Sequence, residues 1–209
     1  MEKRFNPVTY ARRMKMPELK VFEYLAFIMP VFFAVMWILS ATIEGKWTFG
    51  VNSLSDMGVS ENAVSAFLFN FGCIAAGLGG FVIGIGTYAY GKRTLKIGGL
   101  IAALSFIFLS LVGVFTLNTF SMHSFVASTF GVLLFISMVL SSVSDFRVSW
   151  YLYFDIPFII AVAIVVLTQP FAVWEAITVI GAMIWILMLG YKMHIRDDRL
   201  FGDEPNLRV

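Results

Sequence analysis

Long apolar runs separated by short polar segments dominate the chain. Six such runs cover residues 21–43, 62–90, 95–117, 123–143, 150–168 and 173–191. About 20 predominantly apolar residues are enough to cross the hydrocarbon core of a bilayer as an α-helix. The pattern therefore predicts an all-α, polytopic integral membrane protein with six transmembrane helices. A basic N-terminal arm (residues 1–20) precedes this single domain (residues 21–191), and a charged tail (residues 192–209) follows it.

The composition supports the same class and excludes several others. Hydrophobic residues make up 59% of the chain and charged residues only 13%, with a mean hydropathy of +0.86. A soluble domain carries about 25% charged residues, so no appended soluble catalytic domain is expected. The one cysteine, Cys73, excludes an intrachain disulfide and a cysteine-based metal centre. A net charge of +2 lacks the excess of positive charge that is typical of nucleic-acid-binding proteins.

The distribution of positive charge predicts the orientation. Of the 15 Lys and Arg residues, all but Lys46 fall in the two termini, in the loops after the second and fourth runs, or at the start of the third run. Cytoplasmic loops carry the excess of Lys and Arg. Both termini are therefore predicted to be cytoplasmic, in a multi-pass protein of the cell membrane. The loops that contain Asp56, Asn118 and Gln169 are predicted to face outward.

Small residues at four-residue spacing indicate how the helices pack. In lipid, close backbone approach and interhelical hydrogen bonds drive association, because the hydrophobic effect between helices is weak. The second, third and fourth runs carry such stripes, so we expect these three helices to form the packed centre. The stripes comprise Gly72, Ala76, Gly80 and Gly84, then Gly99 and Ala103, then Ala127 and Gly131.

Polar side chains gather at the predicted outer end. Ser60 is expected to cap the second helix, because a hydroxyl there accepts from free backbone N–H groups. His123 shares a face with Ala127 and Gly131 and is expected to point inward, and Asn70 is expected inside the bundle. The candidate ligand-binding residues are Asn52, Ser55, Asp56, Asn70, Asn118, His123, Ser124 and Glu175.

Asp56, His123 and Glu175 together would form a shallow outward-facing polar pocket. A histidine beside carboxylates can switch its charge near neutral pH, so the pocket could hold a general base, a lipid headgroup or a proton-coupled gate. The alternative is structural: His123 would tie the Asp56 loop to the bundle by a hydrogen bond, and Glu175 would be solvated. Two carboxylates and a histidine can also bind divalent ions. Nothing in their spacing requires a metal, so neither metal nor cofactor is predicted.

Two carboxylates near the predicted inner face have open roles. Intramembrane carboxylates are candidates for function, and Asp155 is the inner-side candidate. It lies near the interface, where Arg147 or water would reach it. Glu23 has the same ambiguity, with Lys20 close by. The second histidine, His194, is predicted a membrane thickness away from His123, which excludes bis-histidine haem.

Several short motifs resemble a known family. They are Asn52-Ser53-Leu54-Ser55-Asp56-Met57-Gly58, Ala66 to Gly72, Val112-Gly113-Val114-Phe115, and His123-Ser124. In this order and spacing, over residues 21–190, the chain is similar to domain-of-unknown-function family 998 of small archaeal and bacterial membrane proteins. It is more distantly similar to six-helix DRAM/Frag/Sfk-like membrane proteins, some of which are linked to lipid organisation. The resemblance implies six helices and the outer polar cluster, and it implies no reaction.

Three function classes remain open. The first is a non-enzymatic protein that binds or moves a lipid or similar amphiphile through the outer pocket. The second is an accessory or structural subunit of a membrane complex, so the expected partners are the bilayer, a bound lipid or other subunits. The third is an intramembrane hydrolase or transferase that uses His123 with Asp56 or Glu175. It would need a nucleophile such as Ser55, Ser124 or Ser128, and turnover that is lost in His123→Ala would distinguish it.

Overall fold

The computed structural model describes residues 17–145, 149–195 and 200–202. Within these residues lie six long helices and two short 3-10 helices, η1 (Ser55–Val59) and η2 (Leu117–Thr119). The long helices are α2 (Pro17–Glu44), α3 (Ala63–Tyr90), α4 (Thr94–Val114), α5 (Phe120–Asp145), α6 (Ser149–Thr168) and α7 (Phe171–Ile195). Residues 1–16 of the basic arm, Arg147 and most of the charged tail lie outside the described residues.

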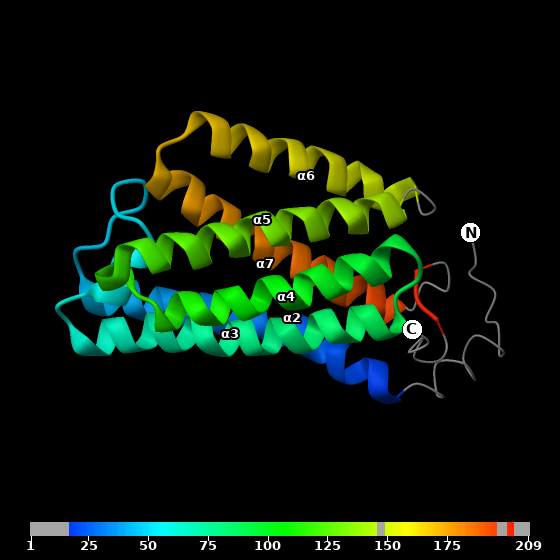
Figure 1. The fold of residues 1–209 in the computed structure, drawn as a ribbon, viewed down its shortest axis with the longest axis horizontal. Coiled ribbons are helices and arrows are strands. Elements are labelled where there is room, and N and C mark those ends of the chain that lie inside the picture. Colours follow the sequence, from blue (N-terminus) through cyan, green and yellow to red (C-terminus); the bar gives the residue numbers. More distant parts are fainter. Residues whose placement is uncertain (1–16, 146–148, 196–199, 203–209) are drawn as a thin grey trace.

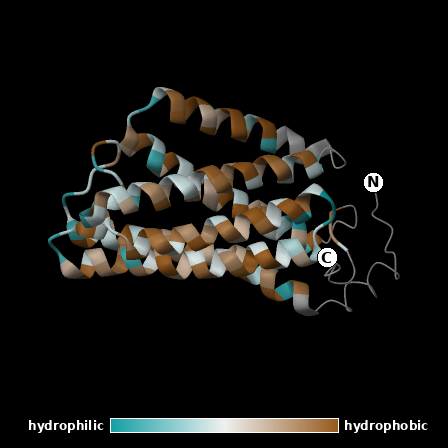
Figure 2. Cartoon of the chain, viewed as in Figure 1, coloured by the Kyte–Doolittle hydropathy of each residue, from teal (hydrophilic) through white to brown (hydrophobic). Residues whose placement is uncertain are grey.

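The helices have the length and composition of membrane spans. Five of them are long and apolar enough to cross a membrane, and α6 contributes the shorter apolar helix Asp155–Thr168. Apolar residues cover the length of the helices, and hydrophilic residues concentrate toward the two ends of the bundle (Figure 2). The predicted fold class, an all-helical multi-pass membrane protein, is confirmed. The direction of insertion stays a prediction, and we use it to call the end with the 45–62 loop the outer end.

The six helices form a closed ring in chain order. Each long helix packs against the next one, and α7 returns to pack against α2. The contact of α3 with α4 is the most extensive, whereas α6 makes the least extensive contacts and lies at the edge of the bundle (Figure 1). The ring therefore has one closely packed side and one loosely packed side.

Glycines let the backbones of α3 and α4 approach closely, at what we call the α3–α4 seam. A Cβ atom added to Gly84 would lie 2.5 Å from the backbone nitrogen of Ala103, and one added to Gly99 would lie 2.5 Å from that of Tyr88. Gly80 faces the ring of Phe106. Backbone atoms cannot move aside as a flexible side chain does, so only glycine fits at the two backbone contacts.

The other small residues have different surroundings. Gly72 packs against Met36 of α2, Ala76 is buried and Ala127 is half-buried. Gly131 is exposed, and an added Cβ atom would meet nothing within 4 Å. Its predicted packing role is therefore wrong within the described chain. The contact of α5 with α4 lies instead at Gly98, which accepts a 2.8 Å hydrogen bond from Ser137.

Serine hydroxyls reinforce the same side of the ring. Ser40 of α2 bonds to the hydroxyl and carbonyl of Ser65 on α3, both at 2.9 Å. Ser110 donates to the Ile74 carbonyl at 3.2 Å, and Ser105 to that of Phe130 at 2.8 Å. Hydrogen bonds of this kind hold helices together in lipid. The start of α3 depends on another polar residue, since Asn62 rather than Ser60 accepts from the first free N–H groups.

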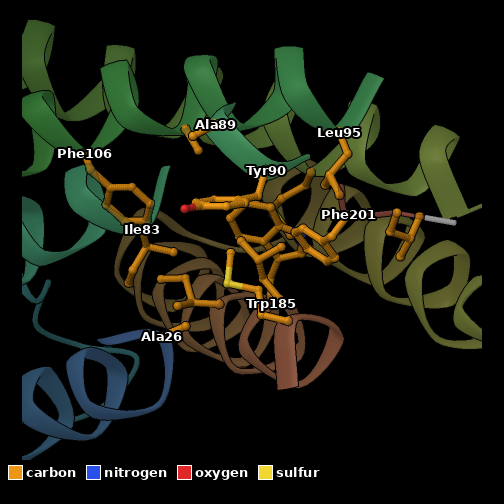
Figure 3. Packing of buried hydrophobic residues seen from close by; sticks show 14 of the residues in the cluster. Ala26, Ile83, Ala89, Tyr90, Leu95, Phe106, Trp185 and Phe201 are labelled. Atoms are coloured by element: carbon orange, nitrogen blue, oxygen red, sulfur yellow. The ribbon is translucent and has the colours of Figure 1, made fainter. Parts of the chain in front are cut away.

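Chain segments close both ends of the ring. At the outer end, residues 53–58 form an outer plug whose Leu54 and Met57 side chains are almost fully buried. At the inner end, residues 200–202 form an inner plug, which exchanges two backbone hydrogen bonds with Tyr90 and Lys92. Phe201 of this plug packs in the same core cluster as Tyr90 and Trp185 (Figure 3). The interior is thus covered at each end.

Candidate functional site

Glu175 of α7 fastens the outer plug to the bundle. Its Oε2 accepts a 2.6 Å hydrogen bond from the backbone N–H of Leu54, and its Oε1 accepts one from the Ser55 hydroxyl. Asn70 of α3 adds a bond from its side-chain amide to the Gly58 carbonyl at 2.9 Å. Glu175 therefore acts as a half-buried acceptor for the plug, and the prediction that it is simply solvated is wrong.

His123 lies beneath the plug and has a different partner from the one expected. It is almost fully buried, and its Nδ1 lies 2.7 Å from the Phe115 carbonyl at the end of α4. A carbonyl only accepts, so Nδ1 carries the proton and donates it. The structural alternative, a bond from His123 to the Asp56 loop, is therefore wrong. Within the described part of the chain, His123 Nε2 is buried and has no hydrogen-bond partner.

Three helices bring ionisable or reactive side chains together beneath the plug. The Glu175 carboxylate interacts electrostatically with His123 of α5 and with Cys73 of α3. Asp56 does not join them, because it is exposed and its carboxylate accepts a 2.8 Å bond from the Ser53 N–H. Among the described residues no group of three His, Cys, Asp or Glu side chains could hold a metal ion.

A small apolar cavity lies farther into the membrane, about one helical turn below Glu175 on α7 and about two turns below His123 on α5. Its volume is about 40 Å³, and its lining comes from α2, α3, α4, α5 and α7. On α7, Val179 and Ala182 line the cavity on the face that carries Glu175. On α5, Phe130 lines it on the face that carries His123. The unpartnered His123 nitrogen and the cavity thus lie on the same side of the same helices.

A second polar cluster lies at the inner end, where three helices meet. Lys192 of α7 pairs with Asp145 of α5 and, at 3.3 Å, with Asp155 of α6, and all three side chains are almost fully buried. Asp145 Oδ1 is buried without a hydrogen-bond partner in the described structure. Glu23 of α2 bonds to His194 of α7 at 2.7 Å instead of pairing with Lys20. We call Asp145, Asp155 and Lys192 the inner charge cluster.

With this geometry established, comparison with known proteins places the chain in a family. Residues 27–192 match the family model described as "Protein of unknown function (DUF998)". The chain belongs to the DUF998 family. The match includes His123, Glu175 and the whole inner charge cluster. No curated protein and no solved structure matches the chain, and the distant likeness to DRAM/Frag/Sfk-like proteins stays a prediction.

The remaining candidates of this DUF998 member lie outside the His123 environment. Asn52 accepts a 3.0 Å bond from the Thr48 N–H within its own loop. Asn118 is exposed in η2, and Ser124 is half-buried on α5. These residues shape or border the outer end. Asn52 and Asp56 thus bond within the outer loop, whereas Asn118 and Ser124 border the outer end.

Sequence reasoning missed two members of the inner charge cluster. Lys192 was assigned to the cytoplasmic tail, and Asp145 lies at the last residue of α5, where a charge is ordinary. Arg147, the expected partner of Asp155, lies outside the described residues. The one available signal was that Asp155 needs a cationic partner if it is buried, and the sequence does not say which cation that is.

Proposed function

We propose that this multi-pass membrane protein binds an amphiphile in the cell membrane, with the polar head at His123 and the apolar tail in the cavity below it. The observation that carries the proposal is the buried, unpartnered Nε2 of His123 on the side of the bundle that holds the apolar cavity. A buried polar atom without a hydrogen-bond partner lowers stability by about 1–3 kcal/mol. A ligand that bonds to it would recover that free energy.

The protonation of His123 indicates the chemistry of the head. Because Nδ1 donates to the Phe115 carbonyl, Nε2 of the neutral ring is an acceptor. It therefore calls for a donor such as a hydroxyl group. Both oxygens of the nearby Glu175 accept hydrogen bonds, and an ionised carboxylate there would disfavour an anionic head. We infer a neutral, hydroxyl-bearing amphiphile, of which a monoacylglycerol is the simplest example.

The cavity suits an acyl chain and not water. Its lining consists of apolar side chains and one glycine, and an apolar cavity of this kind stays dry. At about 40 Å³ it holds only a short piece of a chain, so a longer tail needs the surrounding helices to separate. Both ends of the ring are covered by the plugs. Entry from the lipid side, past the loosely packed α6, is the route that fits this arrangement.

The enzyme alternative has weaker support. A serine hydrolase needs its nucleophile beside the histidine base, whereas the Ser55 hydroxyl donates to Glu175. His123 uses Nδ1 for the Phe115 carbonyl. Within the described structure, neither Ser124 nor Ser128 forms a hydrogen bond with His123. The arrangement fits an outer plug that is hydrogen-bonded above a binding site better than it fits a chain of proton-transfer groups.

Native mass spectrometry of the purified full chain tests the proposal, with monooleoylglycerol as the probe. We expect wild type to retain the probe and His123→Ala to bind it about tenfold more weakly, because one buried hydrogen bond is lost. Ala182→Val, which fills part of the cavity, should also weaken retention. Asp56→Asn is the matched control, since its side chain faces its own loop, and it should bind like wild type.

Two results would contradict the proposal. Equal retention by wild type and His123→Ala would show that the probe does not use the imidazole. Stronger binding of oleate than of monooleoylglycerol would exclude a neutral head. A co-purified protein of defined mass without any bound lipid would favour an accessory subunit instead.

A further inference from the structure

The inner charge cluster holds more negative than positive charge. Lys192 is the one cation paired with Asp145 and Asp155 among the described residues, and all three side chains are at most 4% exposed. If both carboxyl groups were ionised, the pairing would leave one negative charge buried. Isolated buried charges are costly enough that such groups take up a proton instead. Among the described residues, the cluster therefore lacks one positive charge.

The positions of the two carboxyl groups show where that charge belongs. Both contact the Lys192 ammonium, which holds them near each other, and without a further proton neither carboxylate can donate to the other. Asp145 Oδ1 also has no partner in the described part of the chain. A metal cation is disfavoured because the Lys192 ammonium already lies between the carboxylates and would repel it.

We propose that Asp145 and Asp155 form a proton-binding site that holds one shared proton in the closed bundle, with Lys192 balancing the remaining negative charge. The site goes beyond amphiphile binding and does not depend on it. Its ligand is a proton, and its members come from three different helices. Protonation therefore changes the contact between α5, α6 and α7.

Other charged groups at this end have partners or positions of their own. On α2, the Glu23 carboxylate bonds to His194 of α7. On α4, Lys96 lies 4.8 Å from the centre of the Tyr88 ring. Lys92 and Arg93 occupy the turn before α4, and Tyr191 is exposed on α7. Within the described residues, the Asp145 carboxyl pairs with the Lys192 ammonium.

The site gives α6 its main polar anchor. Between Asp155 and Thr168, Asp155 is the one buried side chain of α6. Loss of the shared proton would leave two carboxylates that repel each other across the α5–α6 contact. We therefore infer that release of the proton loosens the inner end of α6. Only the further step, from a loosened α6 to amphiphile entry, rests on the proposed function.

Infrared difference spectroscopy of the full chain in lipid nanodiscs tests the proton site. We expect wild type at neutral pH to show a protonated-carboxyl C=O band that disappears as the pH rises. Asp145→Asn and Asp155→Asn should each lose this band at neutral pH, because a single carboxylate pairs with Lys192 as an ion. Glu61→Gln changes an exposed carboxyl group at the outer end and should keep the band. No band in wild type, or a band that survives in both aspartate variants, would overturn the proposal.

A distance measurement tests the anchoring of α6 separately. Spin labels on Val143→Cys of α5 and Ile156→Cys of α6, both exposed positions, report on this contact in a Cys73→Ala background. The distance should lengthen over the pH range in which the band disappears, and it should stay constant in Asp155→Asn. A constant distance in the labelled chain that has Asp155 would overturn the anchoring. Failure to retain monooleoylglycerol with the band intact would reject only the proposed function.

Discussion

Helices α3 and α6 are both apolar, yet the ring holds them in opposite ways. In α3, buried residues recur along the whole helix, and glycines bring its backbone against α4. In α6, Asp155 is the one buried side chain between residues 155 and 168. Hydrophobicity decides that both enter the membrane, whereas small residues and polar partners decide how firmly each is held. We infer that α3 belongs to a firmly packed part of the bundle, the fixed frame, and that α6 belongs to a loosely packed part, the movable side.

Removal of the Lys192 cation from the inner charge cluster should produce the largest difference in stability between α6 and α3. Lys192→Met leaves Asp145 and Asp155 buried without a counter-ion, and loss of one partner in such a pair costs about 3–5 kcal/mol. Amide hydrogen exchange should rise in α6 before it rises in α3. The exposed Lys46→Met is the matched control. Equal exchange rates for α6 in the two variants would show that the ions do not anchor it.

The next effect should come from the α3–α4 seam. Gly84→Leu would drive a side chain into the backbone of Ala103, and overpacking of this kind costs about 3 kcal/mol. Thermal unfolding in detergent should move to a clearly lower midpoint. Gly131→Leu meets open space and should change stability by less than about 0.5 kcal/mol. Similar midpoints for the two variants would contradict the fixed frame.

A glycine on the movable side should have a smaller and more local effect. A Cβ atom at Gly181 of α7 would lie 2.7 Å from the tip of the Phe158 ring on α6. Because α6 can shift, Gly181→Leu should cost about 1–2 kcal/mol. The change should be confined to faster hydrogen exchange in α6. Exchange that rises equally in α3 would mean that the two sides are not independent.

The smallest effect should come from the bond between α2 and α3. Ser40→Ala removes the hydroxyl that bonds to Ser65, and such interhelical bonds contribute about 0.6 kcal/mol on average. The unfolding midpoint should fall by a small, measurable amount. Ser128→Ala, at an exposed position of α5, should leave it unchanged. A fall of the same size in the unfolding midpoints of both variants would show that the Ser40–Ser65 bond does not contribute to stability.

The fold could be predicted from the sequence because its main determinant is local. The length of each apolar run identifies a membrane-spanning helix. The four-residue spacing of small residues places Gly84 and Gly99 on particular faces of their helices. The same rule fails at Gly131, since spacing identifies a face and does not identify the neighbour that the face meets. Nothing local in α5 distinguishes Gly131 from Gly98 in α4, which does carry the contact.

The candidate site could be predicted only in part, because its decisive contacts are distant in sequence. Leu54 and Glu175 are 121 residues apart, and Asp145 and Lys192 are 47 apart. The polar character of His123 and Glu175 was visible. Their partners depend on which helices become neighbours in the ring. In the sequence, Lys192 stands near the start of a charged tail, where a solvated lysine is expected. Only the structure shows that it is buried among helices.

Photolabelling tests the central claim, that the bundle encloses an amphiphile beneath His123, most directly. The probe is a monoacylglycerol with a diazirine at the end of its acyl chain, and peptide mass spectrometry locates the adducts. The account predicts adducts on cavity-lining residues such as Phe130 and Met183, and their loss in His123→Ala. Adducts confined to lipid-facing residues such as Val31 and Ile164, unchanged in His123→Ala, would contradict it.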